Sequence, residues 1–155
     1  MPNSATHVNL AMHNIELACM LNNHPKHHDW MATVSFYAAL HVVEALYACQ
    51  SPVFHGQGHE RREAALKRDG RYKQIYRHYR RLWNASTIAR YLDDGTRSYE
   101  TFHDYFSPEE VRTLLMQHHL LSILQSAAKL NLLPQTSREL IKKAEASVRQ
   151  LRPPT

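Results

Sequence analysis

The chain has 155 residues, is 43% hydrophobic and carries a formal net charge of +5. With only 4 Gly and no long polar tract it is not a disordered chain, and its length fits one globular domain over residues 1–152. No apolar stretch approaches the roughly 18–20 residues of a membrane span, and the N-terminus lacks the basic and apolar regions of a secretory leader, so we expect a cytoplasmic protein without membrane contact.

Apolar side chains recur at helical spacing along most of the chain, and no segment shows the alternation typical of a strand. The first apolar stripe consists of Val8, Met12, Ile15 and Cys19. It predicts a helix over residues 4–22. Pro25 disfavours a helical residue before it and therefore ends this segment. Asp29 is the expected N-cap of a second helix over residues 30–49.

The middle of the chain combines a loop with a strongly basic stretch. Residues 50–60 hold two of the four glycines and predict a loop, and residues 61–68 predict a short helical piece. A long helix follows over residues 71–92. Between positions 61 and 90 there are ten Lys and Arg against two Asp and Glu.

The basic side of the 71–92 helix points to an anionic partner, and RNA is the one we expect. Its expected RNA-binding residues are Lys73, Arg77, Arg80 and Arg81. Aromatic residues interleave with them, which suits RNA because phosphates attract Arg and unstacked bases stack on aromatic rings. A solvated, Arg-rich helix face is the alternative.

Two capping signals predict the starts of the last two helices. Ser107 is followed by a proline and, three residues on, by Glu110, which is a capping box that opens a helix to about residue 130. Thr136 and Glu139 repeat the pattern for a final helix to about residue 151. The sequence therefore predicts an all-α fold, an antiparallel bundle of five to six helices.

Two titratable residues interrupt the apolar 30–49 helix. His41 and Glu44 share one side of it with Tyr37 and, being three residues apart, can touch. An unpaired buried Glu is costly, so Glu44 needs a cation, for which Arg62 and Arg90 are the candidates. One interpretation is a hydrogen-bonded pair at the edge of the core, and the other is a polar strip that lines a groove or an oligomer interface.

Several blocks follow one another in an order known from other proteins. They are "DWMATVSFYAALHVVEALYA", "HGQGHERR", "YKQIYRHYRRLWNASTIARYL" and "FSPEEV". Over about residues 28–130 this arrangement resembles the HEPN superfamily (higher eukaryotes and prokaryotes nucleotide-binding), most closely its small, stand-alone bacterial members. The most specific pieces are "FYAALHVVEA", the pair of His59 and Arg62, and "ARY" at 89–91.

The resemblance implies a helical bundle that pairs as a homodimer. It also implies a metal-independent endoribonuclease with a role as a toxin or in phage defence, and a cognate antitoxin or defence-system partner. In such enzymes an Arg is followed a few residues later by a His. The ribose 2′-OH attacks the adjacent phosphate, His acts as general acid or base, and Arg stabilises the charge on the phosphoryl oxygens.

Arg97 with His103 is the pair whose position best matches that signature, and Arg90 in "ARY" stands where active members often place their Arg. These three residues are the expected catalytic group. The other pairs of suitable spacing are Arg71 with His78, and Arg112 with His118 or His119. The first lies early in the basic helix, and packing explains the other histidines equally well.

A second set of polar residues lies inside the blocks that carry the resemblance. These residues are His41, Glu44, His59, Arg62 and Arg90. They form either a supporting hydrogen-bond network or an unconventional site.

The histidine-rich segment "HPKHHD" at 24–29 lacks a Cys partner and helical metal-binding spacing, so we expect no metal site and no cofactor. The functional expectation is thus an RNA-acting protein of the HEPN type. The alternative is a noncatalytic module that binds a nucleotide, a nucleic acid or a partner protein.

Overall fold

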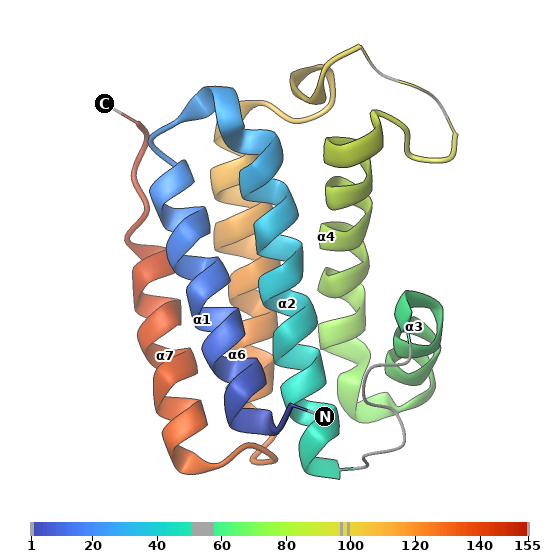
Figure 1. Cartoon of the computed structure of the whole chain (residues 1–155), viewed down its shortest axis with the longest axis vertical. Helices are drawn as coiled ribbons and strands as arrows, with labels where there is room; N and C mark the ends of the chain where they lie inside the picture. The colour runs from blue at the N-terminus through green and yellow to red at the C-terminus, as the bar shows by residue number, and fades with distance from the viewer. Residues whose placement is uncertain (1, 51–57, 97, 99, 155) are drawn as a thin grey trace.

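Long helices run alternately up and down, side by side, in the computed structural model (Figure 1). The structure describes residues 2–50, 58–96, 98 and 100–154. Its main helices are α1 (Ser4–Leu21), α2 (His28–Gln50), α3 (Gly58–Arg68), α4 (Lys73–Tyr91), α6 (Leu121–Lys129) and α7 (Gln135–Arg149). The short α3 lies outside the row, beside one end of α4 (Figure 1). The all-α antiparallel bundle expected from helical periodicity is confirmed.

α2 occupies the centre of the bundle. It packs against α1, α4 and α6, and the ring of helices closes where α7 contacts both α1 and α6. Its buried side chains include Phe36, Val43 and Leu46, each of which stabilises the fold by about 1.5–3 kcal/mol through burial. The hydrophobic core is therefore built around this helix.

The segment Pro25–Gln50 has a mean hydropathy of 1.3 over its most apolar window and is long and apolar enough to cross a membrane. From the sequence we expected no stretch of this kind. However, 78% of that window is buried inside the fold. Packing against the neighbouring helices accounts for its apolar character.

The rod that follows Ser107 changes its helical type along its length. It consists of α5 (Pro108–Glu110), the π-helical segment η4 (Val111–Leu120) and α6, which follow one another without a break. Ser107 caps its start, with the capping box to Glu110 formed as expected. π-Helix is rare and mostly occurs as single-turn bulges inside α-helices, so a segment of this length is unusual.

Two of the expected helix caps are wrong. The 3₁₀ turn η1 (Pro25–His27) leads directly into α2, so Asp29 lies inside the first turn of α2 instead of capping it. There its carboxylate still faces the positive end of the helix dipole. Thr136 does not cap α7 either, because this helix begins at Gln135, directly after the extended Pro134.

Candidate functional site

A groove along the outer side of α4 gathers the basic residues. Its volume is about 700 Å³. The lining residues are Lys73, Gln74, Tyr76, Arg77, Arg80, Arg81, Asn84, Asp94 and Thr96. All four expected RNA-binding residues are among them, and all four are exposed. Helical spacing brings them together, since positions 73, 77, 80, 81 and 84 recur every three to four residues on one face of α4.

The charge of this groove is strongly positive. Arg80 is partly compensated by Glu63 on α3, at 3.9 Å from Arg80 Nε to the carboxylate. The Tyr76 hydroxyl donates to the same carboxylate at 3.2 Å. Asp94 is the acid among the groove residues. Four cations against these two acids give a concave surface that attracts an anion.

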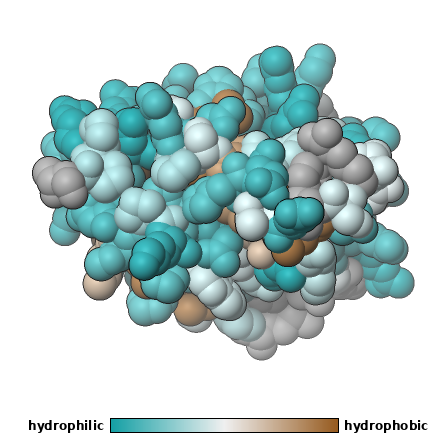
Figure 2. All heavy atoms as spheres, turned by 90° about the horizontal axis from the view of Figure 1, so that it is seen from above, coloured by the Kyte–Doolittle hydropathy of each residue, from teal (hydrophilic) through white to brown (hydrophobic). Residues whose placement is uncertain are grey.

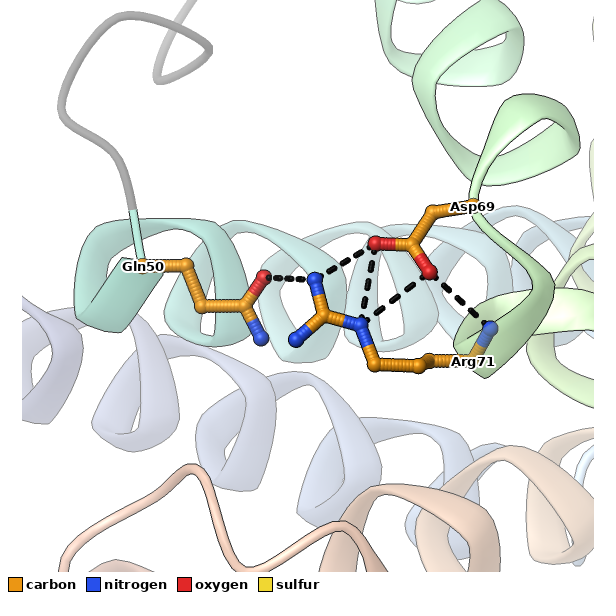
Figure 3. Close-up of polar contacts among 3 residues, drawn as sticks. All are labelled: Gln50, Asp69 and Arg71. Carbon is orange, nitrogen blue, oxygen red and sulfur yellow. Dashed lines mark hydrogen bonds and ion pairs between the residues drawn. The ribbon is translucent and has the colours of Figure 1, made fainter.

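Arg71, just before α4, is not among the residues that line this groove. Figure 3 shows its contacts with Asp69 and Gln50. Its guanidinium donates to the Asp69 carboxylate, with the shortest contact at 2.6 Å, and to the side-chain oxygen of Gln50 at 3.2 Å. These hydrogen bonds lower the pKa of Asp69. Arg71 thereby ties the end of α2 to the turn between α3 and α4.

The aromatic residues of α4 are less accessible than their sequence positions suggest. Tyr72 and Tyr79 are buried, while Tyr76 and Trp83 are half-buried. The His59 ring covers Trp83 in a stacked arrangement with the ring centroids 5.7 Å apart. Tyr76 and Trp83 therefore offer only part of their surface to a ligand.

Two other aromatic residues are open to solvent, and the sequence pattern did not identify them. Trp30 at the start of α2 is 58% exposed and Tyr91 at the end of α4 is 67% exposed. Arg90 links them: its guanidinium lies 5.1 Å from the Tyr91 ring centroid, and it lines a small cavity together with Trp30. Arg90 and Tyr91 are neighbours in the chain, and only the packing of α2 beside α4 brings Trp30 next to them, so no local signal could have revealed this group.

The buried ion pair of Glu44 and Arg62 confirms one of the two partners expected for this carboxylate. Arg62 Nε donates to Glu44 Oε1, and the residues are only 7% and 2% exposed. Burial raises the pKa of the nearby Tyr79 to about 12, although the Arg62 guanidinium acts in the opposite direction. The pair is sealed between α2 and α3, which favours its interpretation as a brace.

His41 and His59 flank this ion pair. The His41 ring stacks on His7 of α1, and their Nδ1 atoms are 3.1 Å apart. Burial lowers the pKa of both His41 and His59, and the Arg62 charge acts in the same direction on each. The fold thus brings His41, Glu44, His59 and Arg62 together, while His7 is a member that no sequence motif marked.

The fifth member of the expected network, Arg90, makes its hydrogen bonds elsewhere. Its Nε donates to the Ser86 carbonyl at 3.1 Å and a terminal nitrogen donates to the Ser86 hydroxyl at 3.2 Å. These bonds hold the guanidinium along the last turn of α4, close to its exposed end. The positive charge of Arg90 therefore contributes to the basic surface of α4 more directly than to the buried pair of Glu44 and Arg62.

Of the expected catalytic pair, Arg97 lies outside the described residues. His103 lies in the 3₁₀ turn η3 (Phe102–Asp104). Its Nδ1 is 3.0 Å from the Phe106 carbonyl oxygen and its Nε2 is 3.1 Å from that of Pro25. This end of the bundle, seen in Figure 2, has a mostly hydrophilic surface. The catalytic assignment stays a prediction. To act as a general acid or base, a ring nitrogen of His103 would have to give up its contact with one of these two carbonyl oxygens.

Comparison with known proteins identifies no relative: no family model, no curated protein and no solved structure matches the chain.

Proposed function

We propose that the protein binds single-stranded RNA in the basic groove of α4. The observation that carries this proposal is the convergence of Lys73, Arg77, Arg80 and Arg81 on one hollowed, solvent-open face. A groove of this kind follows a phosphate backbone, and exposed aromatic rings nearby give unpaired bases a surface to stack on. The choice of RNA over other polyanions rests on the resemblance to the HEPN superfamily.

The groove predicts how the affinity depends on salt. Each phosphate that a Lys or Arg neutralises releases counterions. On a single strand, each such contact makes the slope of the logarithm of the association constant against the logarithm of the salt concentration more negative by about 0.7. Four contacts give a slope of about −3. Removal of two arginines should bring the slope to about −1.5.

The test is fluorescence anisotropy with a labelled single-stranded RNA at several salt concentrations, in EDTA. The double variant Arg77→Ala/Arg81→Ala should bind at least tenfold more weakly and with the shallower slope. Lys142→Ala on the exposed side of α7 removes a charge far from the groove and is the matched control. Equal loss in the control and the groove variant would refute the proposal, as would a salt slope near zero for the native protein.

Cleavage of the bound RNA is the second candidate function. Arg90 and His103 both lie at the end of the bundle formed by the last turn of α4 and the start of α2, since His103 contacts Pro25 and Arg90 shares a cavity with Asp29. The groove reaches the same end through Asp94 and Thr96. This placement supports a site for RNA cleavage at that end, while the HEPN type, the toxin or phage-defence role and the homodimer rest on the resemblance of the sequence to the HEPN superfamily.

The two candidates are separated by incubation of the protein with single-stranded and structured RNA in EDTA. Metal-independent cleavage that is lost in Arg90→Ala, Arg97→Ala or His103→Ala would support the enzyme. Intact RNA together with salt-sensitive binding would refute cleavage and leave the noncatalytic RNA-binding module.

A further inference from the structure

Three histidines from two different elements converge beside the basic groove. They are His78 of α4 and the consecutive His118 and His119 of η4. Their ring centroids form a triangle with sides of 4.8, 5.2 and 5.3 Å. One ring nitrogen of each residue lies within 4.8 Å of the other two, which is close enough for all three to share one ion.

The π-helical segment makes this convergence possible. In a π-helix each turn contains more residues than in an α-helix, so consecutive side chains are separated by a smaller angle. His118 and His119 can therefore both face α4, although they are neighbours in the chain. The π-helical segment ends just after the two histidines, at Leu120.

The state of the imidazoles suits a metal ligand. Burial, followed by the charge of His118, lowers the pKa of His78. The same two influences, together with His78, Arg81 and Arg77, lower the pKa of His119 to about 4. Burial thus favours the neutral form of both rings, which is the form that binds a metal ion, whereas the nearby arginines act against a metal cation as they act against a proton.

We propose that His78, His118 and His119 form a binding site for a divalent transition-metal ion, with Zn²⁺ as the fitting example. Imidazole nitrogen suits Zn, Cu and Ni, and three histidines with a fourth position open is an established type of zinc coordination.

The separation between His78 and His119 is close to the one expected around such an ion. The Nδ1 atoms of His78 and His119 are 2.9 Å apart. With Zn–N bonds of about 2.0–2.1 Å, two nitrogens on a tetrahedral ion lie about 3.3 Å apart. A shift of one ring by a few tenths of an ångström closes this difference. The nitrogen of His118, which lies within 4.8 Å of the other two, would move to the same separation as the ion binds. A hydrogen bond between His78 and His119 explains this one distance but not the approach of the exposed His118.

The three histidines line a cavity of about 340 Å³ together with Arg77, Arg81 and Asn84, so a fourth ligand would reach the ion from this cavity. The two arginines repel a dication at this site. The site therefore favours an oxyanion as the fourth ligand, because its negative charge compensates both the dication and the arginines. Arg77, Arg81 and Asn84 also line the RNA groove on the other side. A phosphate group is therefore the oxyanion that this position fits.

This site differs from the histidine-rich segment at 24–29. His28 is buried there, with its Nε2 3.1 Å from the Asn22 carbonyl oxygen, whereas His24 and His27 are exposed. Among the described residues, His78, His118 and His119 are the group whose nitrogens come close enough to hold one ion.

The test is isothermal titration of the tag-free protein with ZnCl₂, in the absence of RNA. We expect one site of micromolar or better affinity, and visible absorption of tetrahedral cobalt when Co²⁺ replaces Zn²⁺. His118→Gln should weaken binding at least tenfold and abolish the cobalt band. Because His118 is exposed, this variant should keep its helical circular dichroism.

The matched controls are His13→Gln on the exposed side of α1 and His24→Gln in the α1–α2 turn, both of which should bind Zn²⁺ as the native protein does. Absence of Zn²⁺ binding would overturn the proposal, and so would binding that His118→Gln and His119→Gln leave unchanged. Since RNA takes no part in this titration, its failure and the failure of RNA binding are separate results.

Discussion

The buried pair of Glu44 and Arg62 is the contact whose loss should cost most stability. Replacement of Arg62 by Met keeps most of its volume but removes the Arg62 cation from the Glu44 carboxylate in a site that is only 2% exposed. Removal of one partner from a buried ion pair costs about 3–5 kcal/mol. For a domain of this size, that corresponds to a fall in Tm of about 6–20 °C.

A double-mutant cycle measures the coupling between the two residues. Urea unfolding is followed by circular dichroism for the native protein, Arg62→Met, Glu44→Met and the double variant. Each single variant keeps one buried charge and removes the opposite charge that lies against it, whereas the double variant removes both. We therefore expect both singles to be strongly destabilised and the double variant to recover to near the native value, because apolar replacements of a buried pair are often neutral or stabilising.

An exposed ion pair is the control for this cycle. Arg80 and Glu63 form an ion pair between α4 and α3, and the Arg80 side chain is 67% exposed. Arg80→Met should change the free energy of unfolding by less than about 1 kcal/mol. The reasoning fails if Arg62→Met costs no more than this control, or if the double variant loses the sum of the two single effects.

Three further predictions concern a cap, a pH dependence and the exposed aromatics. Ser107→Ala should cost about 1 kcal/mol in urea unfolding, because Ser107 forms a capping box, whereas Thr136→Ala should cost less, because Thr136 caps nothing. The contribution of buried histidines such as His119 to the free energy of unfolding should be complete above pH 6.5 and decrease as the pH drops towards 4. In this range His119 binds a proton in the unfolded chain but not in the folded protein, where its pKa is about 4. The urea midpoint should therefore fall less steeply with decreasing pH in His119→Gln than in the native protein. Trp30→Ala and Tyr91→Ala should each weaken RNA binding by about 1–3 kcal/mol in anisotropy titrations if bases stack on these rings, and unchanged affinity would exclude that contact.

Local patterns in the chain determined a large part of this protein. The all-α class follows from apolar residues at helical spacing, and the start of α5 follows from the Ser107 capping box. The basic groove could also be predicted, because Lys73, Arg77 and Arg81 lie on a single helix whose periodicity sets their common face. In each case the residues that interact are close in sequence.

The sequence limited the partner of Glu44 to two arginines but could not decide between them. Burial of a carboxylate demands a cation, and two arginines were available. Arg62 is the partner because α3 packs where it can reach into the core, while Arg90 is held by Ser86 at the end of α4. Physical chemistry imposed the requirement, and tertiary packing selected the residue.

Tertiary structure alone decided the remaining features. His7 meets His41 across 34 positions of sequence, and His78 meets His119 across 41. No periodicity within a helix encodes such contacts, because they depend on how two helices are rotated and shifted against each other. The chain by itself therefore determined its helices and the positive face of α4, and only their packing brought the histidines together.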